Sequence, residues 1–253
     1  MRKLWEIKQS AADPKALDVY IYGDVEGDWY GWFGEEHQSE TSAKAFRDKL
    51  SEHPEAEKIN LFINSYGGSV FEGTAIYSQL KRHGAHKTAY IDGFACSIAS
   101  VIAMACDEIV MPRNTMMMIH NMWMGCCGNA AELRKAADDL DTINNAGRQA
   151  YLEKAGDKLS EDKLVEMMDA ETWLTAAQCI EYGLADRFAD EEADLTAANQ
   201  MLEKATAAMN QKLQANRCIA AQLKEITKPA EKPKEPEKKP ENSVKKMLSG
   251  LFA

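Results

Sequence analysis

The stretch that most constrains this chain is residues 92–100, where an apolar strand runs directly into an apolar helix. Residues 89–91 predict a buried strand, and residues 98–105 predict a buried helix, so Ser97 lies at the junction. The first amides of a helix have no intrahelical partner and favour negative charge. That environment suits a serine that attacks a carbonyl and creates an oxyanion. On this stretch alone, a helix N-cap is the more ordinary role for Ser97.

The segment before this stretch makes a catalytic role more plausible. Residues 59–63 predict a strand, Gly67 and Gly68 follow it, and residues 71–83 predict a helix that ends at Gly84. With the next strand, 87–91, this pattern is typical of a βαβ unit. Two successive strand–turn–helix units place the Gly-Gly turn and Ser97 at the same edge of a parallel sheet, where sites form.

The rest of the first 190 residues supplies further elements of an α/β fold. Strands are expected at 17–22, 108–111, 116–119 and 184–188, and helices at 41–50, 129–155, 160–168 and from a Thr175/Gln178 capping box to Gly183. The aromatic residues of 29–33 are expected to serve packing or a subunit contact. His120 follows directly on the apolar run 116–119; a histidine in such a place is usually structural.

From residue 191 onward the character of the chain changes. Residues 191–227 carry an apolar stripe typical of a long amphipathic helix or coiled coil. Residues 228–253 begin with a Pro/Lys/Glu-rich linker, expected to be disordered, and end in a short apolar tail that is either frayed or a docking peptide. The expected organisation is an N-terminal segment 1–58 packed on a core of 59–190, followed by these two extensions.

Composition excludes several classes of function. A net charge of −10 argues against nucleic-acid binding as the main activity. Six cysteines have neither disulfide-framework nor zinc spacing, so free thiols in a reducing cytoplasm are expected. No secretory signal, apolar run of membrane-spanning length or nucleotide-binding P-loop is visible. No metal, cofactor or membrane partner is therefore expected.

Four motifs in order give the chain a specific resemblance. They are I-N-S-Y-G-G-S-V at 63–70, G-F-A-C-S-I-A-S at 93–100, M-I-H-N at 118–121, and W-L-T-A at 173–176 continuing to E-Y-G-L-A-D at 181–186. Gly68 and Ser97 are 29 residues apart in the sequence, and Ser97 and His120 are 23 residues apart. Residues 59–188 resemble the proteolytic subunit of the Clp protease (ClpP), most closely the ClpP-like proteases of phage and prophage head maturation. Trp5-Glu6-Ile7 and residues 20–24 resemble the phage branch alone.

The resemblance implies a role for each matching residue. Ser97 is expected to be the nucleophile and His120 the general base. Glu171 occupies the position of the family's catalytic Asp, and Asp169 is the nearby alternative. The backbone amides of Gly68 and Ile98 are expected to form the oxyanion hole.

Substrate binding follows from the same resemblance. Gly67, Gly68 and Asn121, with the strand after His120, are expected to hold a peptide as an added β-strand. Two residues depart from the family pattern: Tyr66 replaces the usual Pro, and Cys96 replaces an Ala. The first can alter the loop's rigidity and the second could be oxidised, but neither removes a catalytic group.

The resemblance implies a repeated ββα superhelix of the ClpP/crotonase type, and a ring-shaped homo-oligomer whose contacts involve helix 129–155. The expected function is an ATP-independent serine endopeptidase that cleaves capsid or scaffold proteins, in the host cytoplasm or the assembling phage prohead. One alternative is a general ClpP-type peptidase partnered with an ATP-driven unfoldase. Another is a non-catalytic capsid assembly protein, and a crotonase-type acyl-CoA enzyme ranks below both because such enzymes lack this Ser/His pairing.

Overall fold

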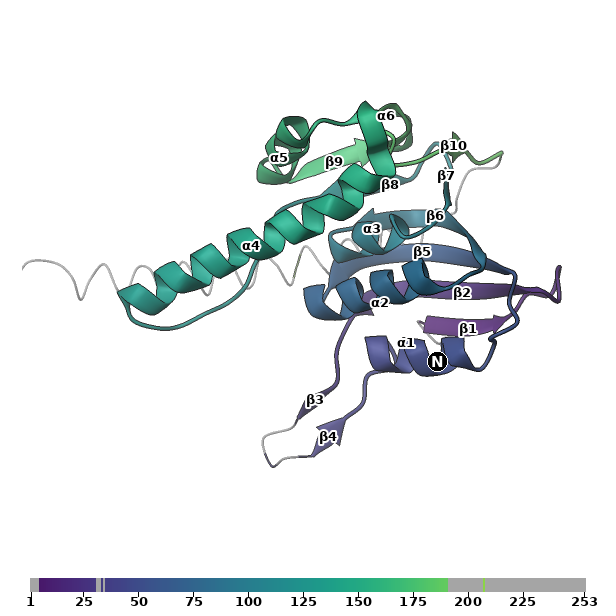
Figure 1. Ribbon diagram of the computed structural model, residues 1–253, viewed down its shortest axis with the longest axis horizontal. Helices are drawn as coiled ribbons and strands as arrows, with labels where there is room; N and C mark the ends of the chain where they lie inside the picture. Colours follow the sequence, from purple (N-terminus) through teal and green to yellow (C-terminus); the bar gives the residue numbers. More distant parts are fainter. Residues whose placement is uncertain (1–4, 31–32, 34, 191–206, 208–253) are drawn as a thin grey trace, which may run out of the picture. The chain divides into compact units, whose positions relative to one another are not determined.

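A computed structural model describes residues 5–30, 33, 35–190 and 207, and these residues form a mixed α/β fold around one sheet (Figure 1). The sheet has eight strands in the described residues. They are β1 (Trp5–Gln9), β2 (Ala16–Val25), β5 (Lys58–Gly68), β6 (His86–Cys96), β7 (Glu108–Met111), β8 (Met116–Ile119), β9 (Thr172–Thr175) and β10 (Arg187–Phe188). The α/β class predicted from sequence is confirmed.

The order of the strands brings two chain segments to one edge of β6. The main path runs β1-β2-β5-β6-β7-β10, and β8 pairs with β6 beyond the end of β7. The pairs from β2 to β10 along this path are parallel, and so is β6 with β8. β1 is antiparallel to β2, and β9 is antiparallel to β8. The carboxyl ends of β5, β6 and β8 therefore lie together.

Helices connect these strands. They are α1 (Ala43–Ser51), α2 (Val70–Arg82), α3 (Ile98–Ala103), α4 (Ala130–Ala155), α5 (Glu161–Asp169) and α6 (Ala176–Glu181), with a 3₁₀ turn at Gly156–Lys158. A separate hairpin, β3 (Trp29–Tyr30) and β4 (Glu36–His37), projects between β2 and α1 (Figure 1). Local signals set the helix ends: Ser42, Ser69, Ser160 and Thr175 each cap a helix with a side-chain oxygen.

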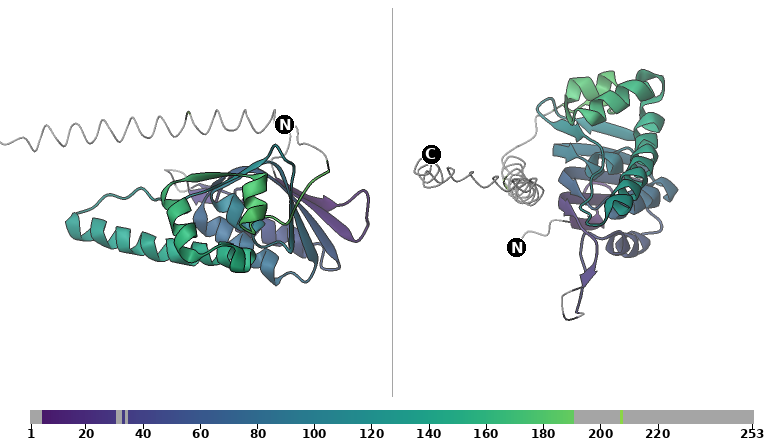
Figure 2. Two further views of the ribbon diagram at one scale, coloured as in Figure 1. Left: turned by 90° about the horizontal axis from the view of Figure 1, so that it is seen from above. Right: turned by 90° about the vertical axis from the view of Figure 1, so that its left-hand side faces the viewer.

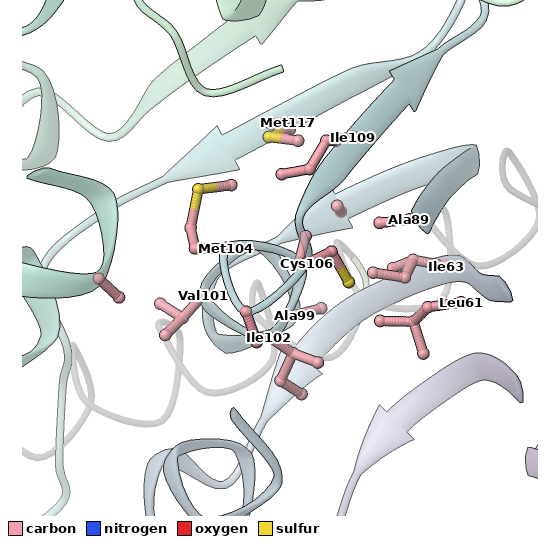
Figure 3. Close-up of a cluster of buried hydrophobic side chains, with 14 of the residues drawn as sticks. Leu61, Ile63, Ala89, Ala99, Val101, Ile102, Met104, Cys106, Ile109 and Met117 are labelled. Carbon is pink, nitrogen blue, oxygen red and sulfur yellow. The ribbon is translucent and has the colours of Figure 1, made fainter. Parts of the chain in front are cut away.

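One face of the sheet packs against α1, α2 and α3, and the right-hand view of Figure 2 shows the helices on that side. Figure 3 shows the apolar contacts: Leu61, Ile63 and Ala89 from the strands meet Ala99 and Ile102 from α3, and all are fully buried. The opposite face carries a row of stacked aromatic rings. Tyr20 lies on Phe62 with centroids 4.8 Å apart, and Phe62 on Tyr90 at 5.2 Å.

Several elements differ from the sequence expectation. β5 and β6 extend past the predicted ends at residues 63 and 91 to Gly68 and Cys96, because each continues to pair with a neighbour. β9 lacks the alternation that marks a strand and forms because it pairs with β8. Trp29 and Phe33 are not core residues: Trp29 is 55 % exposed, with its ring stacked on His37, and Phe33 is 92 % exposed.

The apolar stripe predicted on helix 129–155 is buried only at its C-terminal end. Tyr151 and Ala155 are buried, whereas Leu133 is 44 % exposed and Ala137 is exposed. Gly147 lies against the Met122 side chain, since an added Cβ would lie 2.3 Å from Met122 Cε. In the first turns of α4, by contrast, no described residue covers the apolar stripe that includes Leu133 and Ala137.

The helix and linker predicted for 191–253 lie outside the described residues, apart from Ala207. The superhelical repeat and the domain boundaries stay predictions. Within the described ranges, no helix combines the length and apolar composition needed to span a membrane.

Candidate active site

Ser97 lies between the last residue of β6 and the first residue of α3, in a backbone conformation rare for a residue with a side chain. Its φ is 54° and its ψ is −131°. Such strain of about 1–3 kcal/mol persists only where surrounding contacts hold the residue. Ser97 N–H donates to the Met118 carbonyl at 2.8 Å, and the Ser97 carbonyl accepts from Ser100 N–H at 3.0 Å. The strand and the helix thus hold the residue from both sides.

His120 is in hydrogen-bond contact with Ser97. The distance between His120 Nε2 and Ser97 Oγ is 2.8 Å. The sheet brings them together: β8 runs parallel to β6 with Cys96 opposite Met118, so the residues just beyond each strand emerge side by side. A serine hydroxyl at this distance can pass its proton to a neutral imidazole.

The surroundings of His120 favour that neutral form. Burial lowers the pKa of His120 below its ordinary value of 6.5, while the charge of Glu171 and a hydrogen bond with the Asn121 backbone act in the opposite direction. The net shift is downward, so the imidazole is neutral at pH 7. A neutral ring is able to accept a proton from Ser97.

The two candidate carboxylates contact different groups. Glu171 lies in the left-handed region (φ 51°) just before β9, whose Thr172 pairs with Ile119. Its charge therefore acts on His120. Asp169, at the end of α5, accepts a hydrogen bond from Asn121 Nδ2 at 2.6 Å. The electrostatic effect on His120 thus comes from Glu171, and Asp169 holds the neighbouring residue.

Gly67 lies against the Ser97 turn and Gly68 lies against Val25, and neither position has room for a side chain. Their φ angles are 101° and 141°, in the region that favours glycine. A Cβ on Gly67 would lie 2.8 Å from Ser97 Cβ and 3.3 Å from Ile98 N. A Cβ on Gly68 would lie 2.2 Å from the Val25 carbonyl oxygen. The backbone of Gly67 therefore lies next to Ser97 and Ile98.

Asn121, which is predicted to help bind substrate, is held by residues of α5. Its N–H donates to the Met168 carbonyl at 3.3 Å and its Nδ2 to Asp169, while no described residue reaches its buried Oδ1. The expected strand after His120 is also absent, since residues 121–129 have no regular structure. Antiparallel β9 occupies the available edge of β8 instead.

The two departures from the family pattern, Tyr66 and Cys96, pack in one small hydrophobic cluster. Cys96, Phe94 and Met118 form a small buried cluster to which Tyr66 and Trp173 add their rings. The Tyr66 ring lies 6.1 Å from that of Trp173. Burial raises the pKa of the Cys96 thiol, which keeps it protonated and unreactive.

Residues that position this site include one that sequence patterns did not single out. Asn144, buried on α4, accepts a hydrogen bond at 2.7 Å from Met122 N–H, two residues after His120. A polar residue on the apolar stripe of an amphipathic helix was the available signal. Within the described part of the chain, no group of three or more His, Cys, Asp or Glu side chains is arranged to hold a metal.

Comparison with known proteins agrees with this geometry. The Clp protease family model matches residues 35–192. The "ATP-dependent Clp protease proteolytic subunit" of Deinococcus radiodurans is 31% identical over 144 residues, 56% of this chain and 69% of that protein. Subunit 1 of Streptomyces avermitilis is 30% identical over 149 residues (58% and 67%), and the subunit of Chlorella vulgaris 30% over 143 (55% and 70%). The chain belongs to the Clp protease family of serine-type peptidases.

Proposed function

We propose that this chain is a serine endopeptidase in which Ser97 is the nucleophile, His120 the general base and Glu171 the third member of the triad. The observation that carries the proposal is the 2.8 Å contact between His120 Nε2 and Ser97 Oγ, made at a strained strand–helix turn. Glu171 supports the imidazolium that forms when His120 takes the proton. Burial lowers the pKa of His120 by more than the charge of Glu171 raises it, so the ring is neutral before the reaction.

The reaction follows from this placement. Ser97 Oγ bonds to the carbonyl carbon of the scissile peptide while its proton passes to His120 Nε2. The backbone N–H groups of Gly68 and Ile98 stabilise the oxyanion. The C–N bond then breaks, and His120 returns the proton to the leaving amine. Water attacks the acyl-enzyme, gives its proton to His120, and releases the acid as Ser97 recovers its hydrogen.

Intact-mass analysis after treatment with an alkyl fluorophosphonate tests the nucleophile. Ser97 Oγ bonds to phosphorus and displaces fluoride, while its proton passes to His120 and then to solvent, so wild type should gain one phosphonyl group per chain. Ser97→Ala should gain none. Ser51→Ala, which removes an exposed hydroxyl on α1, should label like wild type. Absence of labelling in folded wild type would overturn the protease proposal and favour an assembly protein without catalysis.

For substrate class, we propose capsid or scaffold proteins, cut without ATP. The support is the resemblance of Trp5-Glu6-Ile7 and residues 20–24 to the phage branch. The second candidate is a peptidase that works with an ATP-driven unfoldase, which the names of the relatives favour. Cleavage of a scaffold protein by the isolated chain supports the first; cleavage that appears only with an unfoldase and ATP supports the second.

For assembly, we propose a homo-oligomeric ring, as the family resemblance implies. The exposed apolar stripe on the first turns of α4, including Leu133 and Ala137, supports it because a second copy would bury this stripe. Light scattering of the full chain should give a mass several times that of one chain. A monomer at micromolar concentration would contradict the proposal.

A further inference from the structure

We propose that Ser100 and Tyr151 are positioning residues, which fix the peptide bond between Ser97 and Ile98 and so aim the Ile98 N–H at the oxyanion. This inference rests on the proposed function of Ser97 and Ile98. It adds a hydroxyl chain that begins on α4, far from the motifs of the site.

The chain consists of two hydrogen bonds. Ser100 Oγ lies 2.6 Å from the Ser97 carbonyl oxygen and 2.7 Å from Tyr151 Oη. A serine hydroxyl has one hydrogen, and a carbonyl can only accept. Ser100 therefore donates to Ser97, and Tyr151 must donate to Ser100. Successive hydroxyl bonds of this kind polarise and strengthen one another.

The Ser97 carbonyl and the Ile98 N–H belong to one peptide unit. That unit is planar and trans, so its C=O and N–H point in opposite directions. Holding the oxygen in place fixes the direction of the N–H. The constraint matters because the φ of Ser97 is 54°, a conformation that the isolated chain would leave.

Burial makes this hydroxyl chain more than ordinary packing. Ser100 is 0 % exposed and Tyr151 is 2 % exposed, so bulk water does not readily replace either partner. A phenylalanine would fill the same apolar space on α4, so packing alone does not explain the hydroxyl of Tyr151. Its partner lies 51 residues earlier in the chain, at the first turn of α3.

The test compares Tyr151→Phe with wild type in the full chain, using a small fluorogenic peptide. We expect kcat to fall about tenfold with KM within about twofold, because removing a whole oxyanion donor costs more, about 10²–10³. Ser100→Ala should lose at least as much. The double variant should match Ser100→Ala, because Tyr151 acts only through Ser100.

Tyr77→Phe is the matched control. The Tyr77 hydroxyl also reaches α4, at 3.2 Å from Glu153 Oε2, but it does not contact the Ser97 turn. Its kcat should stay within about twofold of wild type. An equal loss in both variants would show a general effect of α4 contacts and would overturn the inference.

A ratio of affinities separates positioning from loss of folded protein. A peptide boronic acid bonds to Ser97 Oγ and places a hydroxyl in the oxyanion hole, whereas the matching peptide carboxamide binds without a tetrahedral centre. Tyr151→Phe should weaken the boronate about tenfold and leave the carboxamide unchanged. Partial unfolding lowers both signals together and leaves the ratio unchanged, a result that would overturn the inference.

The results for wild type test the proposed function of Ser97 itself. If wild type neither hydrolyses the peptide nor binds the boronate, the proposed function of Ser97 fails. If wild type does both and Tyr151→Phe equals it in kcat and in the affinity ratio, the function stands and the positioning role is wrong.

Discussion

At the residue scale, the site depends on backbone conformations that few residues adopt. Ser97, Gly67 and Gly68 all have positive φ, and an added Cβ on Gly67 would lie 2.8 Å from Ser97 Cβ. In its strained conformation Ser97 makes no side-chain capping bond to α3, and the absence of a side chain at Gly67 lets a second backbone segment approach it. These backbone conformations therefore allow the end of β5 to approach the Ser97 turn closely.

Gly67→Ala should abolish most activity. The new Cβ would meet Ser97 Cβ at 2.8 Å and the Cys96 carbonyl at 2.9 Å, at a φ of 101°, so the glycine segment must move away from the nucleophile. We expect peptide hydrolysis to fall roughly a hundredfold or more. Gly84→Ala is the control, since nothing lies within 4 Å of its added Cβ. Equal activity in both variants would show that this contact does not matter.

Glu171→Gln should shift the pH dependence of catalysis. Burial lowers the pKa of His120 and the Glu171 charge raises it, so removing that charge lowers this pKa further. The acid limb of kcat/KM, already below pH 6.5 in wild type, should move to lower pH, and the plateau should fall roughly a hundredfold or more. Asp169→Asn should leave the limb in place. A shift in Asp169→Asn alone would make Asp169 the third member.

The same shift gives the sign for stability. The folded chain holds His120 neutral where the unfolded chain, with a pKa of 6.5, already binds a proton. Just below pH 6.5 the unfolded state therefore binds more protons than the folded state. The free energy of unfolding falls as the pH drops from 6.5 toward the pKa of His120 in the folded chain.

At the element scale, β8 and α4 bring distant parts of the site together. β8 pairs with β6 on one side and β9 on the other, which brings His120 next to Ser97 and Thr172 of β9 opposite Ile119. α4 contributes Tyr151 toward α3 and Asn144 toward the segment after His120. The site therefore depends on how one helix and one four-residue strand are docked.

Asn144→Ala should destabilise the chain and loosen the segment after His120. It leaves the Met122 N–H without its 2.7 Å acceptor, at a cost of about 1–3 kcal/mol. Urea unfolding should show that loss, and kcat should fall. Asn145→Ala, at the next and exposed position, should change stability by less than about 0.5 kcal/mol. Equal stability of the two variants would contradict this role.

At the scale of the whole molecule, the described core is built from residues between Trp5 and Ala185. It is a layer of strand residues from β2, β5 and β6 against α1–α3 and the end of α4. All proposed site residues lie within the same range. None of the core residues in the described part of the chain therefore lies at or after residue 191.

Deleting residues 191–253 should therefore spare the chemistry. We expect hydrolysis of a small peptide within about twofold of wild type, because the core and site residues stay in place. Cleavage of a scaffold protein, or packaging with capsid protein, should be impaired if the extension is a docking segment. Unchanged assembly with capsid protein would reject that role, and loss of peptide hydrolysis would show that the extension supports the fold.

Much of the fold could be predicted from local sequence patterns. Apolar runs, glycine breakers and caps located β5, α2, β6, α3, β7 and β8 in the correct order, and placed Ser97 at a strand–helix junction. The roles of His120 and Glu171 came from motif resemblance rather than from these patterns. β9 and the buried role of Asn144 were missed because both arise from pairing with segments far away in the chain.

The sequence by itself therefore determined the α/β class, the order of most elements and the family, because periodicity, caps and breakers act between neighbouring residues. Only the tertiary structure decided that His120 lies 2.8 Å from Ser97, which face of the sheet the helices cover, and that Tyr151 reaches Ser97 through Ser100. The physical reason is that these contacts join segments tens of residues apart. Their geometry is set by strand order and core packing, which no local pattern encodes.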